Sequence, residues 1–368
     1  MRSEDIARLA GVSRSTVSRV INQYPNVPEE TRQKVMKVIE EHHYEPNTNA
    51  RVLAGKGTDT IGLFVISTAE KTRGNRIYQN NYFAPFVDAL VDTANALGYY
   101  VLIHTVYSEE DFQKIRQAFS QKRIDGGVIV GTQKNLEEIR SIVQLGEPLV
   151  LIDYDPAELA RHHMDNNTVA VINTKDFAGG SEAVAHLIAL GHREIAFISG
   201  RLNTHSGRER LRAYESALEE HGIPLRKELV LDGDFRRGPA CRAVTEFLAA
   251  GERPTAFFAA NDEMALGALD AFRDFGLRVP EDVSLIGFDD SPIASRLTPA
   301  LTSVRLPIAE MSQTAAETVV AMCRKRSASF SAVSFPTRLV VRESCAEKRV
   351  EVPADGSAST DAGSDVPG

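Results

Sequence analysis

The chain has 368 residues, 43% hydrophobic and 25% charged, which is enough for two or three domains with cores of their own and excludes a fibrous or wholly disordered protein. No apolar run reaches the length of about eighteen residues that a membrane span needs. Arg2, Glu4, Asp5 and Arg8 interrupt the N-terminus before an apolar signal segment can form, so we expect a cytoplasmic protein.

The formal net charge of −8 is distributed unevenly along the chain. Residues 1–57 hold nine Lys/Arg and seven Asp/Glu, whereas the remainder holds 33 and 43. This mild asymmetry permits nucleic-acid contact at the N-terminus without establishing it. The three cysteines, Cys241, Cys323 and Cys345, are widely spaced and lack metal-binding patterns, so we expect no disulfide framework, no metal site and no cofactor.

The first elements predicted in chain order are two short helices joined by a tight turn. Ser3 can cap a helix over 4–10, Gly11 supplies the turn, and Ser13 can cap a second helix over 14–22. A third helix begins at Pro28. This is the order of a helix-turn-helix head.

The second helix has two contrasting faces. Val17, Val20 and Ile21 form an apolar stripe that can pack inward. The opposite face consists of polar donors: Arg14, Ser15, Ser18, Arg19 and Asn22. Short hydroxyl and amide side chains suit phosphate contact, and Arg suits guanine in the major groove. Any solvated helix face is polar, however, so the residues alone leave a head without DNA function open.

A connector over 46–58 follows the head. Its segment 47–55 is bounded by Pro46 and Gly55 and makes barely two helical turns, which are not stable alone. Composition by itself favours a flexible linker here.

The body alternates short apolar runs with segments of helical period, beginning with TIGLFVIS, FAPFVDALVDTANALG and YYVLIHTV. The alternation restarts near GGSEAVAHLIALG, which predicts two doubly wound parallel sheets. We expect a ligand cleft at the carboxyl ends of their strands. Polar residues follow several strands there, including Asp153, Asn261 and Asp289, although each can equally be a helix cap or a turn residue.

These stretches resemble the lactose/galactose repressor family. In the head, the resemblance covers IARLAGVSRSTVSRVIN and YPNVPEETRQKVMKVIEEHHYEPNTNARVLAGK, including the AGVS turn. In the body, it covers RIDGGVIV, HLIALGHREIAFISG, SGRERLRAYESALEEHGI, AANDEMALGALDAFRDFGLRVPEDVSLIGFDD and RLVVRES. The resemblance implies an all-α helix-turn-helix head and an α/β core of the periplasmic-binding-protein type, with two doubly wound parallel-sheet subdomains.

The domains expected from this resemblance are a head over 1–45, a hinge over 46–58 and an effector-binding core over 59–345. The tail over 346–368 is rich in Ser, Ala, Asp, Gly and Pro and has no apolar periodicity, so we expect it to be disordered. Within the core, the N-subdomain is expected at about 59–153 and 286–318, and the C-subdomain at about 154–285 and 319–345.

The resemblance also implies roles for individual residues. Arg14, Ser15 and Arg19 would contact bases, while Thr16, Ser18 and Asn22 would contact phosphates. In the hinge, Leu53 would enter a base step of the minor groove, and Ala50 would be small because two hinges touch. The effector would be bound by Phe83, Asp153, Ser206, Arg210, Phe235, Asn261 and Asp289.

We therefore expect a homodimeric, nucleoid-associated transcriptional regulator, in the repressor mode, that binds a palindromic operator in double-stranded DNA. Its effector is expected to be a sugar, sugar acid or purine-like molecule. The segment 69–80 reads as an insertion, and NNYFAPF lacks the Asn-Pro common in relatives, which leaves the effector's identity open.

The sequence disfavours two rival functions. An enzyme is disfavoured because GxGxxG, phosphate-loop and GxSxG motifs are missing, and the histidines show no metal or triad spacing. An extracytoplasmic binding receptor is disfavoured by the head and by the absence of a signal segment. No catalytic residues are therefore assigned.

Overall fold

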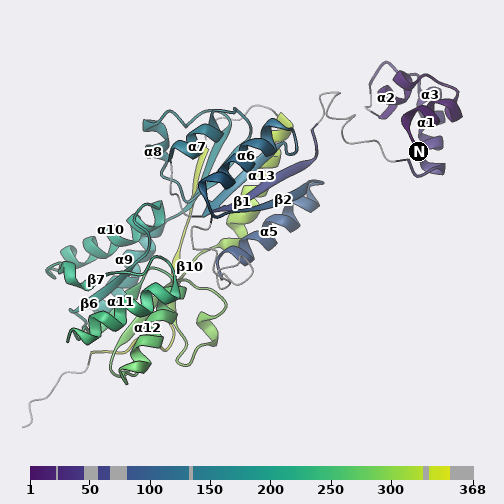
Figure 1. Cartoon of the computed structure of the whole chain (residues 1–368). Helices are drawn as coiled ribbons and strands as arrows, with labels where there is room; N and C mark the ends of the chain where they lie inside the picture. The colour runs from purple at the N-terminus through teal and green to yellow at the C-terminus, as the bar shows by residue number, and fades with distance from the viewer. Residues whose placement is uncertain (22–23, 45–56, 67–80, 132–135, 326–330, 349–368) are drawn as a thin grey trace, which may run out of the picture. The chain divides into compact units, whose positions relative to one another are not determined.

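The computed structural model describes residues 1–21, 24–44, 57–66, 81–131, 136–325 and 331–348 (Figure 1). The chain divides into two compact units. Unit 1 comprises Met1–Thr174, Asn203–His205 and Pro307–Phe335, and unit 2 comprises Lys175–Leu202, Ser206–Leu306 and Pro336–Gly368.

The head consists of α1 (Ser3–Ala10), α2 (Arg14–Ile21) and α3 (Glu29–Glu41). Ile6, Val17 and Val35 are fully buried in a small core of its own. Gly11 ends α1 in the left-handed region with φ 64°, which a glycine adopts without strain. The predicted cap of α1 is displaced by one residue, because the Asp5 carboxylate accepts the N–H of Arg2 at 2.9 Å and Ser3 is already helical.

The first sheet, in unit 1, has the strand order β11-β5-β4-β3-β1-β2, and all of its described strand pairs are parallel. Its strands are β1 (Thr60–Ile66), β2 (Tyr100–Val106), β3 (Gly126–Gly131), β4 (Leu149–Ile152), β5 (Val169–Thr174) and β11 (Ser331–Phe335).

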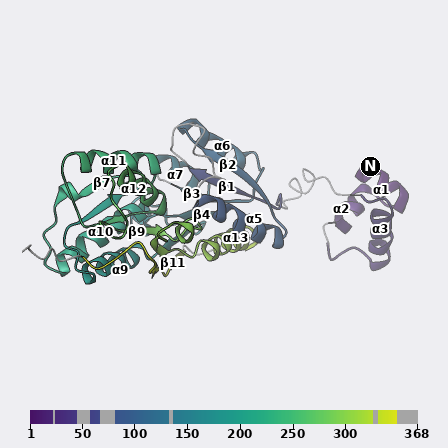
Figure 2. The ribbon, with the colours of Figure 1, turned by 90° about the horizontal axis from the view of Figure 1, so that it is seen from below.

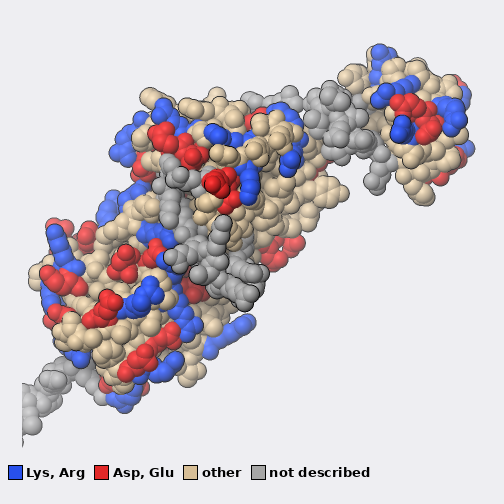
Figure 3. Space-filling model, in the orientation of Figure 1, with Lys and Arg blue, Asp and Glu red and all other residues tan. Residues whose placement is uncertain are grey.

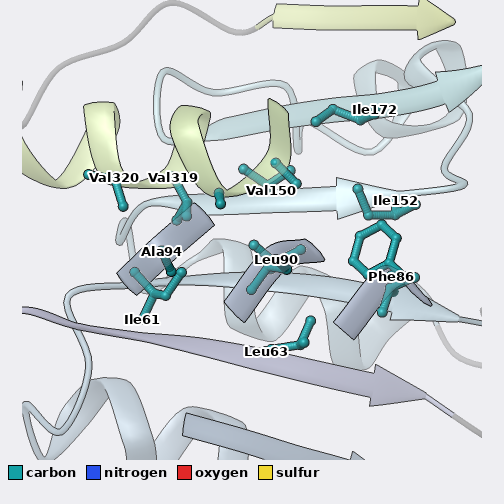
Figure 4. Packing of buried hydrophobic residues seen from close by; sticks show 14 of the residues in the cluster. Ile61, Leu63, Phe86, Leu90, Ala94, Val150, Ile152, Ile172, Val319 and Val320 are labelled. Carbon is teal, nitrogen blue, oxygen red and sulfur yellow. The ribbon is translucent and has the colours of Figure 1, made fainter. Parts of the chain in front are cut away.

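Helices cover both faces of this sheet. They are α5 (Phe83–Ala96) and α13 (Ile308–Lys325) on one face, and α6 (Glu109–Ser120), α7 (Leu136–Val143) and α8 (Pro156–Arg161) on the other. Side chains alternate along β1, so that Leu63 packs with α5 and α13 while Phe64 packs with α6. Figure 4 shows Phe86 and Leu90 of α5 directed toward the strands from the same side as Val319 of α13.

The second sheet, in unit 2, has the strand order β12-β10-β9-β8-β6-β7, and only β12 is antiparallel to its neighbour among the described pairs. Its strands are β6 (Ile195–Ser199), β7 (Val230–Asp232), β8 (Ala256–Ala259), β9 (Ser284–Asp289), β10 (Thr302–Arg305) and β12 (Arg338–Val340). Short 3-10 turns occur at η2 (Lys227–Leu229) and η3 (Ala294–Arg296).

Aromatic side chains join this sheet to its helices, which are α9 (Asp176–Ala189), α10 (His205–Glu220), α11 (Arg237–Ala249) and α12 (Asp262–Asp274). Phe257 meets Phe272 of α12 with ring centroids 4.9 Å apart, whereas Phe197 stacks on Tyr214 of α10 at 5.1 Å. In Figure 2, α11 and α12 lie on one side of β9 and α9 lies on the other. Two doubly wound α/β units are thus confirmed.

The points at which the chain crosses between the units differ from the predicted subdomain boundaries. The first crossing follows Thr174 rather than Asp153, because the buried strand β5 pairs with β4 in the first sheet. Residues 286–306 belong to unit 2, since β9 and β10 complete the second sheet. Residues 319–335 belong to unit 1, where α13 packs on α5 and β11 pairs with β5.

Candidate DNA-binding and effector-binding sites

One face of α2 is polar and open to solvent. Val17 and Val20 are 0% and 2% exposed and Ile21 is half-buried, as the sequence predicts. The opposite face carries the predicted DNA-contacting residues Arg14, Ser15, Ser18 and Arg19, all exposed. Thr16 is half-buried beside this face, and Asn22 lies outside the described residues.

Hydroxyl groups organise the start of α2. Ser13 Oγ accepts the N–H of Thr16 at 3.1 Å, which confirms the predicted cap. The same oxygen lies 2.7 Å from Ser15 Oγ and 2.8 Å from Thr16 Oγ1. Three hydroxyl groups therefore gather at the N-terminus of α2, and helix N-termini and hydroxyl side chains are both common contacts of phosphate oxygens.

Charge on the head is mixed rather than uniformly basic. Arg14 pairs with Glu4 at 3.1 Å, with both side chains more than half exposed. Such a surface pair contributes at most about 1 kcal/mol, so it opposes a contact to DNA only weakly. Figure 3 shows Lys and Arg side chains around a smaller acidic group on the visible face of the head.

In unit 2, Arg210 of α10 lies at the centre of a buried polar group. Its Nε and Nη2 approach Asp176 Oδ1 at 2.8 and 2.7 Å, and its Nη1 donates to the carbonyl of Ala260. The guanidinium also lies 3.7 Å from the ring centroid of Phe288. Because Arg210 is only 4% exposed, these partners, rather than water, stabilise its positive charge.

Asp289 lies beside Arg210, and Asp262 lies close enough to Asp289 to raise its pKa. Asp289 approaches Arg210 Nη1 at 3.7 Å, and burial raises its pKa well above the usual value despite that guanidinium. Burial also raises the pKa of Asp262 to about 6, although hydrogen bonds from Ser303 and Ser291 lower it. At 3.7 Å, the contact of Arg210 with Asp289 is longer than its contact with Asp176 at 2.7 Å.

Asn261 and Phe235 lie at the same end of the second sheet. Asn261 Oδ1 accepts the N–H of Met264 at 2.9 Å, so it caps α12, and its Nδ2 donates to Phe235 O at 3.3 Å. Phe235 has φ 55°, and its ring is packed against Gly200, where an added Cβ would overlap it. Ser206 is half-buried and precedes Arg210 by one turn of α10, so both lie on one helix face.

Asp176 is the residue of this group that the sequence reasoning missed. It begins α9 directly after β5 and is 2% exposed. The sequence signal for Asp176 is a polar residue just after a buried strand. The sequence analysis did not predict VAVINT as a strand, so Asp176 was not recognised.

The remaining predicted effector residues are in unit 1. Asp153 directly follows β4 with φ 68°, and its N–H bonds to Ile172 O at 3.3 Å. Phe83 begins α5, and its ring meets Tyr82 edge-on at 5.4 Å. The predicted hinge residues Ala50 and Leu53, the insertion 69–80 and the tail beyond residue 348 lie outside the described residues.

Comparison with known proteins bears on both regions. Residues 4–47 match the model of bacterial regulatory proteins of the lacI family, and residues 184–345 match a periplasmic binding protein-like domain. The HTH-type transcriptional repressor PurR of Erwinia tasmaniensis is 36% identical over 352 residues, covering 94% of this chain and 96% of the relative. The chain belongs to the lacI family of transcriptional regulators.

Solved structures of lacI-family proteins share its fold. The Lac repressor dimer bound to operator and the anti-inducer ONPF has a TM-score of 0.74 and 29% identity, covering 93% of this chain and 98% of that one. The regulator CelR in complex with cellobiose has a TM-score of 0.71 and 30% identity, covering 94% and 99%. Separately, no helix in the described part of the chain has the length and apolarity to cross a bilayer.

Proposed function

We propose that this lacI-family regulator binds a palindromic operator as a homodimer and that a small polar metabolite, a sugar or sugar derivative, controls its operator affinity. The observation that carries this proposal is the exposed polar face of α2 on a head that has its own core. The similarity to the operator-bound Lac repressor dimer supports the DNA partner, and the similarity to the cellobiose complex supports a sugar effector. Such a protein acts at the chromosome, so we place it in the cytoplasm at the nucleoid.

On this proposal, α2 enters the major groove. Arg14, Ser15 and Arg19 contact base edges, while Thr16, Ser18 and Asn22 contact phosphates. Arg suits guanine O6 and N7 because its planar donors pair bidentately, and short hydroxyl side chains let the backbone approach the phosphates. Dimerisation repeats the contact on two half-sites, which is why the operator is expected to be a palindrome.

The hinge proposal rests on the resemblance of the connector to the hinge of the family, since composition by itself favours a flexible linker. Leu53 is proposed to enter the central base step of the minor groove, with Ala50 small where two hinges meet. Unstacking a step costs a few kcal/mol, which the added contacts must offset. Leu53→Ala is therefore expected to weaken operator binding sharply and leave random-sequence binding little altered. Equal operator affinity of variant and wild type in a gel-shift titration would show the hinge proposal to be wrong.

The effector is proposed to contact Phe83, Asp153, Ser206, Arg210, Phe235, Asn261 and Asp289. The unit 2 residues combine buried carboxylate, guanidinium and amide groups with one aromatic ring. Carboxylate and guanidinium groups bind adjacent hydroxyls, and a ring packs on an apolar sugar face. A sugar, a sugar acid and a purine-like molecule all present such chemistry.

Selection from random oligonucleotides with the purified full-length chain tests the DNA part of the proposal, with sedimentation velocity to measure the oligomeric state. We expect enrichment of a palindrome and a dimer. A strict monomer, or no enriched palindrome, would refute it.

A thermal-shift screen of sugars, sugar acids and purines tests the effector part. A ligand present at a hundredfold its dissociation constant stabilises the fold by about 2.7 kcal/mol. We further propose that the chain is not an enzyme, so the bound compound should be recovered unchanged after prolonged incubation. Turnover of that compound would contradict this.

A further inference from the structure

Asp125, which lies between α6 and β3, holds the start of the core with its carboxylate. Oδ1 accepts the N–H of Thr58 at 2.7 Å and the Thr58 hydroxyl at 3.1 Å, and Oδ2 accepts the N–H of Asp59 at 2.8 Å. Hydrogen bonds to a carboxylate are stronger than those between neutral groups. We name this arrangement of Asp125 around residues 57–59 the root clamp.

The backbone within the root clamp makes an unfavourable turn. Asp59 has φ 52°, a left-handed conformation that costs free energy in residues other than glycine. Its N–H is held by Asp125, and its carbonyl accepts the N–H of Tyr100 at 2.8 Å. The N–H of Asp125 in turn donates to Thr60 O at 2.8 Å. The chain direction at Asp59 is therefore fixed by the first residue of β2 and by the residue that precedes β3.

Gly57 allows the carboxylate to come this close. A Cβ added at Gly57 would lie 2.4 Å from Asp125 Oδ2 and 2.8 Å from its carboxyl carbon. Real Cβ atoms do not approach other atoms so closely, so an alanine would displace the Asp125 side chain. The root clamp can thus be opened from either partner, by removing the carboxylate or by filling the space at residue 57.

The clamp lies where the connector predicted over 46–58 joins the first strand of the core. We propose that Asp125 is a positioning residue for operator binding, because it fixes the direction in which the chain leaves the core toward the head. This inference rests on the proposed function. A loosened root lets each head sample more orientations, which lowers its effective concentration at the second half-site. It leaves the DNA-contacting face of α2 unchanged.

The test compares Asp125→Ala and Gly57→Ala with a matched control, Asp111→Asn, in the full-length chain. Asp111 is also a capping carboxylate of unit 1, accepting the N–H groups of Tyr107 and Ser108 at 3.0 and 3.2 Å, but it lies at the start of α6. Fluorescence anisotropy measures the affinity for the palindrome enriched by the wild type and for a random-sequence duplex. Thermal unfolding of each variant is recorded in parallel.

We expect both clamp variants to bind the palindrome about tenfold more weakly and the random duplex within about threefold of the wild type. The control should bind both duplexes as the wild type does, even if its melting temperature falls. A role of Asp125 in stability alone would move the melting temperature without changing the ratio of the two affinities.

Three results would refute the proposed positioning role of Asp125. Palindrome binding by Gly57→Ala and Asp125→Ala equal to that of the wild type would refute it while leaving the proposed function intact. An equal loss in Asp111→Asn would show that stability, not position, sets the affinity. Failure of the wild type to enrich any palindrome would refute the proposed function and the clamp together. If Asp125→Ala does not fold, Asp125→Asn, which keeps one acceptor oxygen, takes its place with Gly57→Ala.

Discussion

In the head, most side chains proposed to contact DNA project from a surface that the fold leaves open, whereas in unit 2 the proposed effector contacts Arg210, Asn261 and Asp289 are buried. Arg14 has a side chain 68% exposed and pairs only with another exposed residue, Glu4, among the contacts described for it. Arg210 has a side chain 5% exposed and is bonded to Asp176 and Ala260. The head can therefore lose a contact residue at little cost to its fold, while unit 2 cannot.

The largest effect predicted from this contrast is that of Arg210→Ala. Arg210→Ala removes one partner of the buried ion pair with Asp176, which costs about 3–5 kcal/mol of the free energy of unfolding. Urea denaturation would measure the loss. Arg212→Ala, two residues along α10 at a position 62% exposed, is the control and should cost about 1 kcal/mol or less. Similar losses for both variants would break the contrast.

Arg14→Ala should behave in the opposite way. We expect a loss of about 1–3 kcal/mol in operator binding, concentrated at one base position, with the stability of the fold unchanged. Binding measured on a panel of single-base operator variants would locate the affected position. A uniform loss across all sequences would instead make Arg14 a phosphate contact.

The same contrast explains which site residues could be predicted from the sequence. The open face of α2 follows from its helical period, because Val17 and Val20 had to face inward and the intervening polar residues outward. The pairing of Arg210 with Asp176 joins residues 34 positions apart through the fold, so no local pattern reveals it. The sequence left Asn261 open as a helix cap or as a ligand contact. The structure shows that it caps α12, and its contact with a ligand stays a proposal.

The fold class followed from the alternation of strands and helices, but the crossing points did not. β5 is a short strand buried along its whole length, so it shows no alternation of polar and apolar residues. It also follows α8, whose six residues are too few to show a clear helical period, so the strand-helix-strand order is difficult to recognise in the sequence here. Without β5, the first crossing was placed too early in the chain.

Ser13→Ala sharpens the comparison within the head itself. Ser13 caps α2, and losing a cap costs about 1 kcal/mol of helix stability. Ser15→Ala removes an equally small hydroxyl two residues later without removing the cap. Hydrogen exchange of the α2 amides in the full-length chain should accelerate several-fold in the first variant only. Equal acceleration in both would show that the hydroxyl cluster, rather than the cap, holds the helix.

The smallest expected effect is a change in the pH dependence of stability at His192, which is 3% exposed in unit 2. Its Nε2 lies 3.1 Å from Ala346 O, a group that can only accept, so this nitrogen carries a proton, and its Nδ1 lies 2.9 Å from the Thr255 hydroxyl oxygen. Burial lowers the pKa of His192 below its ordinary value of 6.5, and Lys348 and His186 lower it further, against the hydrogen bond to Ala346. The neutral ring is therefore the form that the fold accommodates.

The sign of this effect follows from proton binding. Below pH 6.5 the unfolded chain takes up a proton at this residue while the folded chain resists it, so the free energy of unfolding falls as the pH decreases. His192→Gln removes the titrating group, and its stability should fall less steeply than that of the wild type between about pH 7 and 5. His162→Gln, at an exposed position, is the control and should follow the wild-type slope. Parallel urea-denaturation profiles for all three proteins would mean that the folded chain accepts the His192 proton as readily as the unfolded one. The polar interior of unit 2 would then tolerate an added charge as the surface of the head does.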